Sequence, residues 1–201
     1  MKQIKFSKII PIALVLIVVA IIIAFGVSLV RSTFFSGSSN TTLSLESDPI
    51  RQGLVSTTDD GSVRMTIRGE LVADEDFRTM QITISPIIRL VTTASGYTGA
   101  QTEQKMLINN IPAYEQFVYA LDKANFTKGS VASDVMSDLR GICATGKVYE
   151  FEVLKSNQPV SYSWTSNCLG SRGTFRAGLN QITELFYDQI PDIKSIINST
   201  W

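Results

Sequence analysis

The stretch ICATGKVYEFEVLKSNQPVSYSWTSNCLG, residues 142–170, carries both cysteines of the chain, one near each end. Apolar and polar residues alternate over residues 149–155 and again over residues 160–165. Alternation with a period of two is typical of half-buried β-strands. The polar residues 156–158 lie between the two runs, so the sequence predicts a β-hairpin with its turn there.

The two cysteines are expected at the open end of this hairpin. Cys143 lies 14 residues before Asn157 and Cys168 lies 11 residues after it, which places the thiols roughly opposite each other. In an oxidising compartment such a pair is expected to form a disulfide, and closing this loop would stabilise the fold by about 3 kcal/mol. A reactive thiol pair and two free cysteines are the alternatives, although the spacing is far from CxxC.

Outside the hairpin, the same alternation predicts two earlier strands, at residues 63–68 and 79–85. Apolar side chains recur at helical spacing over residues 111–123, and Asn110 is a candidate N-cap for that helix.

A second helix is expected from Thr174, a candidate N-cap, to the residues before Pro191. The resulting order is strand, strand, helix, strand, strand, helix. It predicts an α+β fold of tandem ββα type, with a four-stranded antiparallel sheet and both helices on one face. The opposite face is expected to be solvated and rich in Ser, Thr, Glu and Arg.

The N-terminal region carries a long uncharged apolar run, residues 9–30. As a helix it would span roughly 33 Å, enough to cross a bilayer. Three lysines precede the run and only Arg31 follows it closely, which predicts a cytoplasmic N-terminus and an extracytoplasmic remainder. A cleaved signal peptide is the main alternative, but its apolar region is usually shorter. A type IV pilin is a weaker alternative, because no Glu lies within the few residues after Gly26-Val27.

These features divide the chain into four expected parts. Residues 1–8 form a cytoplasmic tail, 9–30 a transmembrane helix, 31–61 a Ser/Thr-rich linker and 62–201 an extracytoplasmic α+β domain. The expected location is therefore the cell membrane, with a single pass.

The composition excludes several functional classes. Eighteen basic and eighteen acidic residues balance each other, which argues against nucleic-acid binding. The chain has no histidine, so His-dependent catalytic triads and His metal sites are excluded. The calcium-loop pattern is absent around Asp74-Glu75-Asp76, and the phosphate-binding and nucleophile-elbow motifs are absent as well. No catalytic, cofactor-binding or metal-binding residue is therefore expected. Glu150 and Glu152 share one strand face and are expected to be solvated surface residues.

Four residues are candidates for contact with a partner. Tyr97 lies between two glycines in an expected loop, and Arg64, Arg68 and Arg78 would form a small basic patch. Ordinary surface charges on strands explain the arginines equally well.

Four stretches resemble a group of uncharacterised single-span membrane proteins from candidate-phyla bacteria, which have small genomes and live attached to other cells. They are SVRMTIRGELVADEDFR (62–78), AYEQFVYALDKANF (113–126), GICATGKVYEFEV (141–153) and SWTSNCLGSRGTF (163–175). The resemblance covers roughly residues 62–191 and the anchor. It implies a bacterial envelope protein and carries over no activity or site residue.

The sequence thus favours a membrane-anchored cell-surface protein whose exported domain binds a protein or surface partner without catalysis. The bilayer itself would be contacted through residues 9–30. A structural subunit of a larger envelope complex is the alternative, and a carboxylate-dependent envelope enzyme is a third.

Overall fold

The computed structural model of the chain describes residues 49–133 and 138–201. In chain order the elements are α2 (Pro49–Val55), β1 (Gly61–Arg68), the 3-10 turn η2 (Asp74–Asp76), β2 (Arg78–Ile84), β3 (Ile88–Ser95), β4 (Ala100–Ile108), α3 (Ile111–Lys123), β5 (Val131–Ala132), β6 (Val148–Lys155), β7 (Gln158–Ser166), α4 (Leu179–Tyr187) and α5 (Ile193–Thr200).

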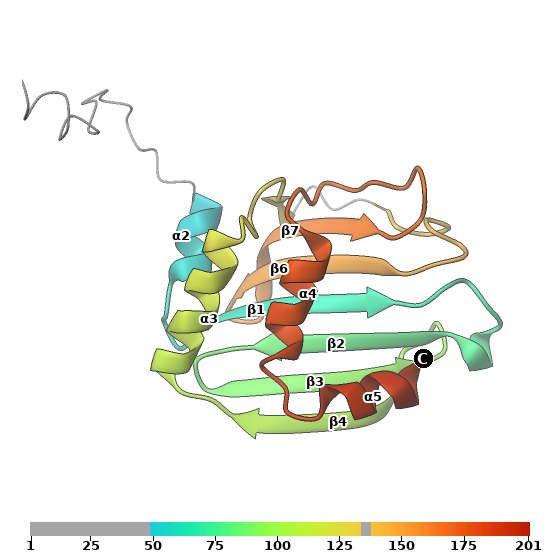
Figure 1. Cartoon of the computed structure of the whole chain (residues 1–201), viewed down its shortest axis with the longest axis horizontal. Coiled ribbons are helices and arrows are strands. Elements are labelled where there is room, and N and C mark those ends of the chain that lie inside the picture. Colours follow the sequence, from blue (N-terminus) through green and yellow to red (C-terminus); the bar gives the residue numbers. More distant parts are fainter. Residues whose placement is uncertain (1–48, 134–137) are drawn as a thin grey trace, which may run out of the picture. The chain divides into compact units, whose positions relative to one another are not determined.

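The seven described strands form one antiparallel sheet, in the order β4-β3-β2-β1-β6-β7-β5 (Figure 1). The predicted four-stranded sheet of tandem ββα units is therefore wrong. Three strands were missed, β3, β4 and β5, so the first helix follows four consecutive strands rather than two. The pairing of β1 with β6 joins the two halves of the chain and leaves β1 in the centre of the sheet.

The predicted hairpin is formed by β6 and β7, which pair from Val148–Ser166 to Lys155–Gln158. Ser156 and Asn157 make the two-residue turn between them, and both have positive φ, 50° and 64°. Positive φ at both central residues defines the type I′ turn, whose twist matches that of the flanking strands.

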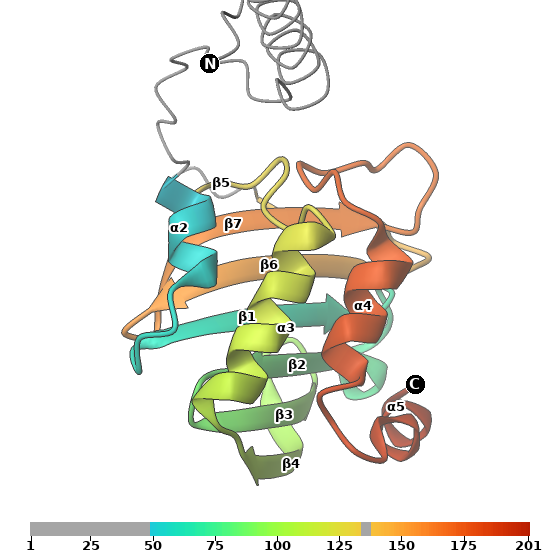
Figure 2. The same cartoon turned by 60° about the vertical axis from the view of Figure 1, so that its left-hand side comes forward.

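All four described helices lie on the same face of the sheet (Figure 2). Their apolar side chains meet those of the four central strands in one core, which includes Met65, Ile82, Phe117, Phe151 and Phe186. The opposite face carries no helix among the described residues, and it is called the helix-free face below.

The helix α3 begins as predicted, because the Asn110 side chain accepts a hydrogen bond from the N–H of Ala113 at 2.9 Å. The last predicted helix begins later than expected. Thr174 does not cap it, and α4 starts at Leu179 after Gly178. The N–H of Phe175 instead donates to the carbonyl of Trp164 at 3.0 Å, which holds this segment beside β7.

The folded unit includes part of the segment expected as a linker. Residues 49–55 form α2, whose Leu54 is fully buried in the core. The Nε atom of Arg51 in this helix lies 2.6 Å from Oδ1 of Asp122 in α3. Structure therefore begins before residue 62, the expected domain boundary.

The expected cytoplasmic tail and transmembrane helix, residues 1–8 and 9–30, lie outside the described residues. Within 49–133 and 138–201, none of the helices is both long enough and apolar enough to span a bilayer.

Candidate binding surface on the helix-free face

Two ion pairs join β1 to β6 on the helix-free face. Arg64 Nε lies 2.5 Å from Glu152 Oε2, and Arg68 Nε lies 2.6 Å from Glu150 Oε1. Strand pairing places Arg64 directly opposite Glu152 and Arg68 on the diagonal to Glu150. Both glutamates are only 7% exposed. The expectation that they are solvated is wrong, because β1, distant in sequence, lies beside them and supplies the arginines.

The second oxygen of Glu150 accepts a hydrogen bond from the hydroxyl of Tyr162 on β7, at 3.0 Å. Burial, and then the negative charge of Glu150, raise the pKa of Tyr162 well above its ordinary value. The phenol therefore stays protonated and acts as a donor. Both oxygens of the Glu150 carboxylate are thus occupied by partners from neighbouring strands.

Beside these pairs the helix-free face is hollowed by a cavity of about 480 Å³. Its apolar lining consists of Leu71, Phe77, Tyr97, Leu139, Ile142 and Val148. Thr66, Arg68, Thr79 and Arg140 supply the polar groups. A mostly apolar concave site with a few polar groups is the usual composition of a ligand-binding pocket.

One wall of the cavity is an aromatic stack. The rings of Phe77 and Tyr97 lie 4.2 Å apart with an interplanar angle of 15°. The Tyr97 hydroxyl donates to the carbonyl of Val72 at 2.8 Å, and its N–H donates to Asp74 at 2.7 Å. Asp74 therefore anchors the β3–β4 turn to the β1–β2 connection and holds the Tyr97 ring in place. Tyr97 nevertheless remains 53% exposed.

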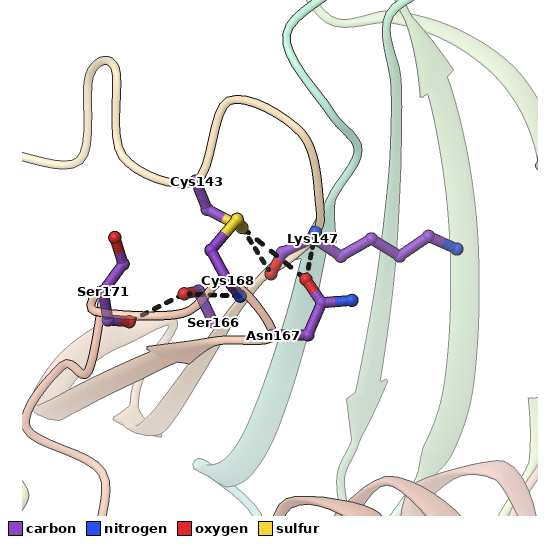
Figure 3. The surroundings of a disulfide bond; sticks show 6 residues. All are labelled: Cys143, Lys147, Ser166, Asn167, Cys168 and Ser171. Atoms are coloured by element: carbon purple, nitrogen blue, oxygen red, sulfur yellow. Dashed lines mark hydrogen bonds between the residues drawn. A yellow bond between two sulfur atoms is a disulfide. The ribbon is translucent and has the colours of Figure 1, made fainter.

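Another wall is the segment before β6, which the disulfide holds against the sheet. Cys143 and Cys168 are paired, with their Cα atoms 5.3 Å apart (Figure 3). Next to them, Asn167 Oδ1 accepts the N–H of Lys147 at 2.7 Å. The predicted pairing of the two cysteines is thus present in the structure, and it fixes the segment from which Leu139 and Ile142 reach the cavity.

Apolar contacts around the disulfide also hold the segment before β6 against the sheet. A second, smaller cluster on the helix-free face contains Val131, Leu139, Ile142, Cys143, Val148, Tyr162, Trp164 and Cys168. The β1–β2 connection is also joined directly to the segment before β6, because the N–H of Leu71 donates to the carbonyl of Ala144 at 2.9 Å. The β1–β2 connection, the β3–β4 turn and the segment before β6 therefore hold one another around the cavity.

The four candidate contact residues do not form one patch. Tyr97 and Arg68 line the cavity, and Arg64 lies next to it on β1 with its guanidinium paired to Glu152. Arg78 is on the opposite face of the sheet, where its guanidinium donates to the backbone carbonyls of Glu75 and Phe77. The alternation in β2 places Arg78 on the same side as Met80, Ile82 and Ile84, which explains its separation from the other arginines.

Most of the cavity lining was missed by sequence reasoning. Leu139 and Ile142 lie in an irregular segment without periodicity, and Phe77 is 20 residues from the tyrosine it stacks on. The one available signal was the cysteine at 143, because a disulfide near a sheet edge brings its flanking residues onto that sheet.

No protein-family model matches this chain, and no curated protein matches it. In the part of the chain that the structure describes, no three side chains of metal-ligating type come together. What the cavity can bind is therefore inferred from its own residues.

Proposed function

We propose that this domain is a non-catalytic binding module of a membrane-anchored cell-surface protein, and that the cavity on its helix-free face receives part of a protein partner. The proposal rests on the residues that line the cavity. A rigid aromatic stack and aliphatic side chains surround a site of about 480 Å³, with the guanidinium of Arg68 at its edge.

The cavity chemistry fits an apolar side chain with a carboxylate close to it in the partner. Aromatic and aliphatic walls favour burial of an apolar group. Arg68 uses Nε for Glu150, and its side chain is 47% exposed, so the guanidinium keeps donors for a further acceptor. Arg140 is paired with Asp138 at 2.6 Å on the surface, where such pairs exchange partners at small cost.

The state of the glutamates supports binding rather than carboxylate catalysis. An acid and base pair needs carboxyl groups that can reach a substrate and exchange protons with it. Glu150 is held by Arg68 and Tyr162, and Glu152 is held by Arg64. Both are almost fully buried among these partners.

Two features of the chain support the proposed extracytoplasmic location. The expected anchor at residues 9–30 would export everything after Arg31. The Cys143–Cys168 pair suits an oxidising environment, where disulfides form and persist. The resemblance to envelope proteins of candidate-phyla bacteria agrees with this placement.

Photo-cross-linking on intact cells tests the proposal. A photoreactive phenylalanine analogue replaces Tyr97 in one variant and Tyr119 of α3 in the control; the two residues are similarly exposed, 53% and 47%, and lie on opposite faces. We expect position 97 to label one dominant protein, at a peptide where an apolar residue neighbours Asp or Glu. Equal labelling from both positions, or labelling of abundant neighbours alone, would count against the cavity.

A further inference from the structure

We propose that the edge strand β4 pairs with β4 of a second copy, in an antiparallel register centred on Gln104. This inference goes beyond the proposed function and does not depend on it. In the sheet order, β4 has a neighbour only on the β3 side among the described strands. It is nine residues long, and all its residues but two are exposed, so it offers a long edge for strand addition.

Two backbone hydrogen bonds show which β3 residues bond to β4. The carbonyl of Ile88 faces β2, because it accepts the N–H of Ser85, and the carbonyl of Ile87 faces β4, because it accepts the N–H of Asn109. Backbone groups alternate along a strand. In the β3–β4 register, therefore, Glu103, Lys105 and Leu107 bond to β3. Gln104 and Met106 direct their peptide groups outward.

When two copies of the same strand pair in antiparallel fashion, a two-fold axis perpendicular to the sheet relates them. One residue then lies opposite its own copy, and the axis passes between the two. With the axis at Gln104, the outward peptide group of Gln104 forms a hydrogen-bonded pair with Gln104 of the second copy. It then places Glu103 opposite Lys105 of the second copy, and Lys105 opposite Glu103. Both ion pairs lie on the helix-covered side, at non-hydrogen-bonded positions, where side chains are closest.

The neighbouring registers lack this complementarity. An axis at Glu103 or at Lys105 would place like charges directly opposite each other, which destabilises a strand pair. An axis at Met106 would place Lys105 opposite Leu107 and leave both charges without a cross-strand partner. The charge order of β4 therefore selects the register centred on Gln104.

Lys105 remains able to make the new contact. Its Nζ donates to the carbonyl of Pro191 at 2.6 Å and lies 3.9 Å from Asp192. An ammonium group has three donors, and the Lys105 side chain is 31% exposed. On the helix-free face, Met106 is 64% exposed and would gain a neighbour from the second copy.

Cysteine cross-linking of the full chain in the cells that express it tests the register. In a hydrogen-bonded antiparallel pair the Cα atoms lie about 5.5 Å apart, a separation that a disulfide bridges. We expect Gln104→Cys to shift most of the chain to twice its monomer mass under mild oxidation. Gln116→Cys on α3 is the matched control, because Gln104 and Gln116 are both exposed, and it should remain monomeric.

Charge reversal provides a second readout. Glu103→Lys in the Gln104→Cys background places lysines opposite each other, and the cross-linked fraction should fall to the level of the Gln116→Cys control. Adding Lys105→Glu exchanges the two charges and should restore cross-linking. Equal cross-linking at positions 104 and 116, or no response to the charge changes, would overturn the proposal.

Discussion

Arg64 and Glu152 face each other across β1 and β6, with Nε and Oε2 2.5 Å apart, although 88 residues separate them in the chain. The pair joins the N-terminal strands of the sheet to the C-terminal hairpin on the face that also carries the cavity. The neighbouring ion pair joins Glu150 to Arg68, and Arg68 also lines the cavity.

Replacing Arg64 alone should destabilise the domain strongly. Arg64→Leu leaves the Glu152 carboxylate buried without its partner, so we expect a loss of about 3 kcal/mol in the free energy of unfolding. The double variant Arg64→Leu/Glu152→Leu removes both charges and should lose clearly less. Urea unfolding of the two variants measures this difference; equal losses would mean that the ion pair is not coupled.

Removing the disulfide should weaken the wall that contains Leu139 and Ile142. The bridge spans 25 residues, so Cys143→Ala/Cys168→Ala should lose about 3 kcal/mol of unfolding free energy. Reduction of the wild-type protein should produce a similar loss in the same denaturation experiment. An unchanged denaturation midpoint in the double variant would show that apolar contacts alone hold the segment.

Gly146 lies where a side chain cannot be accommodated. A Cβ atom there would collide with Asn167 Oδ1 and would lie 3.0 and 3.1 Å from the two disulfide sulfurs. Gly146→Ala should therefore cost about 1–3 kcal/mol of unfolding free energy.

Gly53 of α2 is the matched control for this substitution. A Cβ atom at Gly53 meets only Val153 and Val160, at 3.8 and 3.9 Å, which is ordinary contact. Gly53→Ala should stabilise the domain by up to about 1 kcal/mol, because alanine favours helix more than glycine does. If both variants shift the melting temperature in the same direction, the steric explanation for Gly146 fails.

Alkaline pH should destabilise the fold through its buried tyrosines. Burial raises the pKa of Tyr187 to about 12, and burial also raises the pKa of Tyr114. An unfolded tyrosine ionises near pH 10, so above that pH the unfolded chain binds fewer protons than the folded one. The free energy of unfolding should therefore fall as pH rises from about 10 towards 12. In urea titrations Tyr187→Phe should show a shallower decline; an unchanged slope would exclude Tyr187 as a source.

The strands that sequence patterns predict correctly are those in which apolar and polar residues alternate, such as β1 and the β6–β7 hairpin. β4 was missed because residues 101–105 are all polar and the strand lies at the exposed edge of the sheet. β3 follows Pro86 closely, and its apolar residues do not alternate cleanly. The pairing of β1 with β6 leaves no local signal, so neither the strand order nor the burial of Glu150 could be predicted.

The cavity was only partly predictable for the same reason. Tyr97 was noticed because two glycines flank it within four residues, which is local information. The position of Phe77 under its ring depends on the β2–β3 pairing, which places Arg78 opposite Ser95. The sequence does not separate Arg78 from Arg64 and Arg68, because the expected second strand begins at residue 79 and leaves the face of Arg78 unassigned.

One binding measurement tests most directly whether the cavity is the binding site. It compares the affinity of the partner captured at position 97 for the wild type, Tyr97→Ala and Tyr119→Ala. Tyr97→Ala removes half of the aromatic stack and should weaken binding at least about tenfold, a loss of 1.4 kcal/mol or more. Tyr119→Ala, on the opposite face, should bind as the wild type does. If the two variants bind equally well, or if Tyr119→Ala is the weaker one, the partner does not use the cavity on the helix-free face.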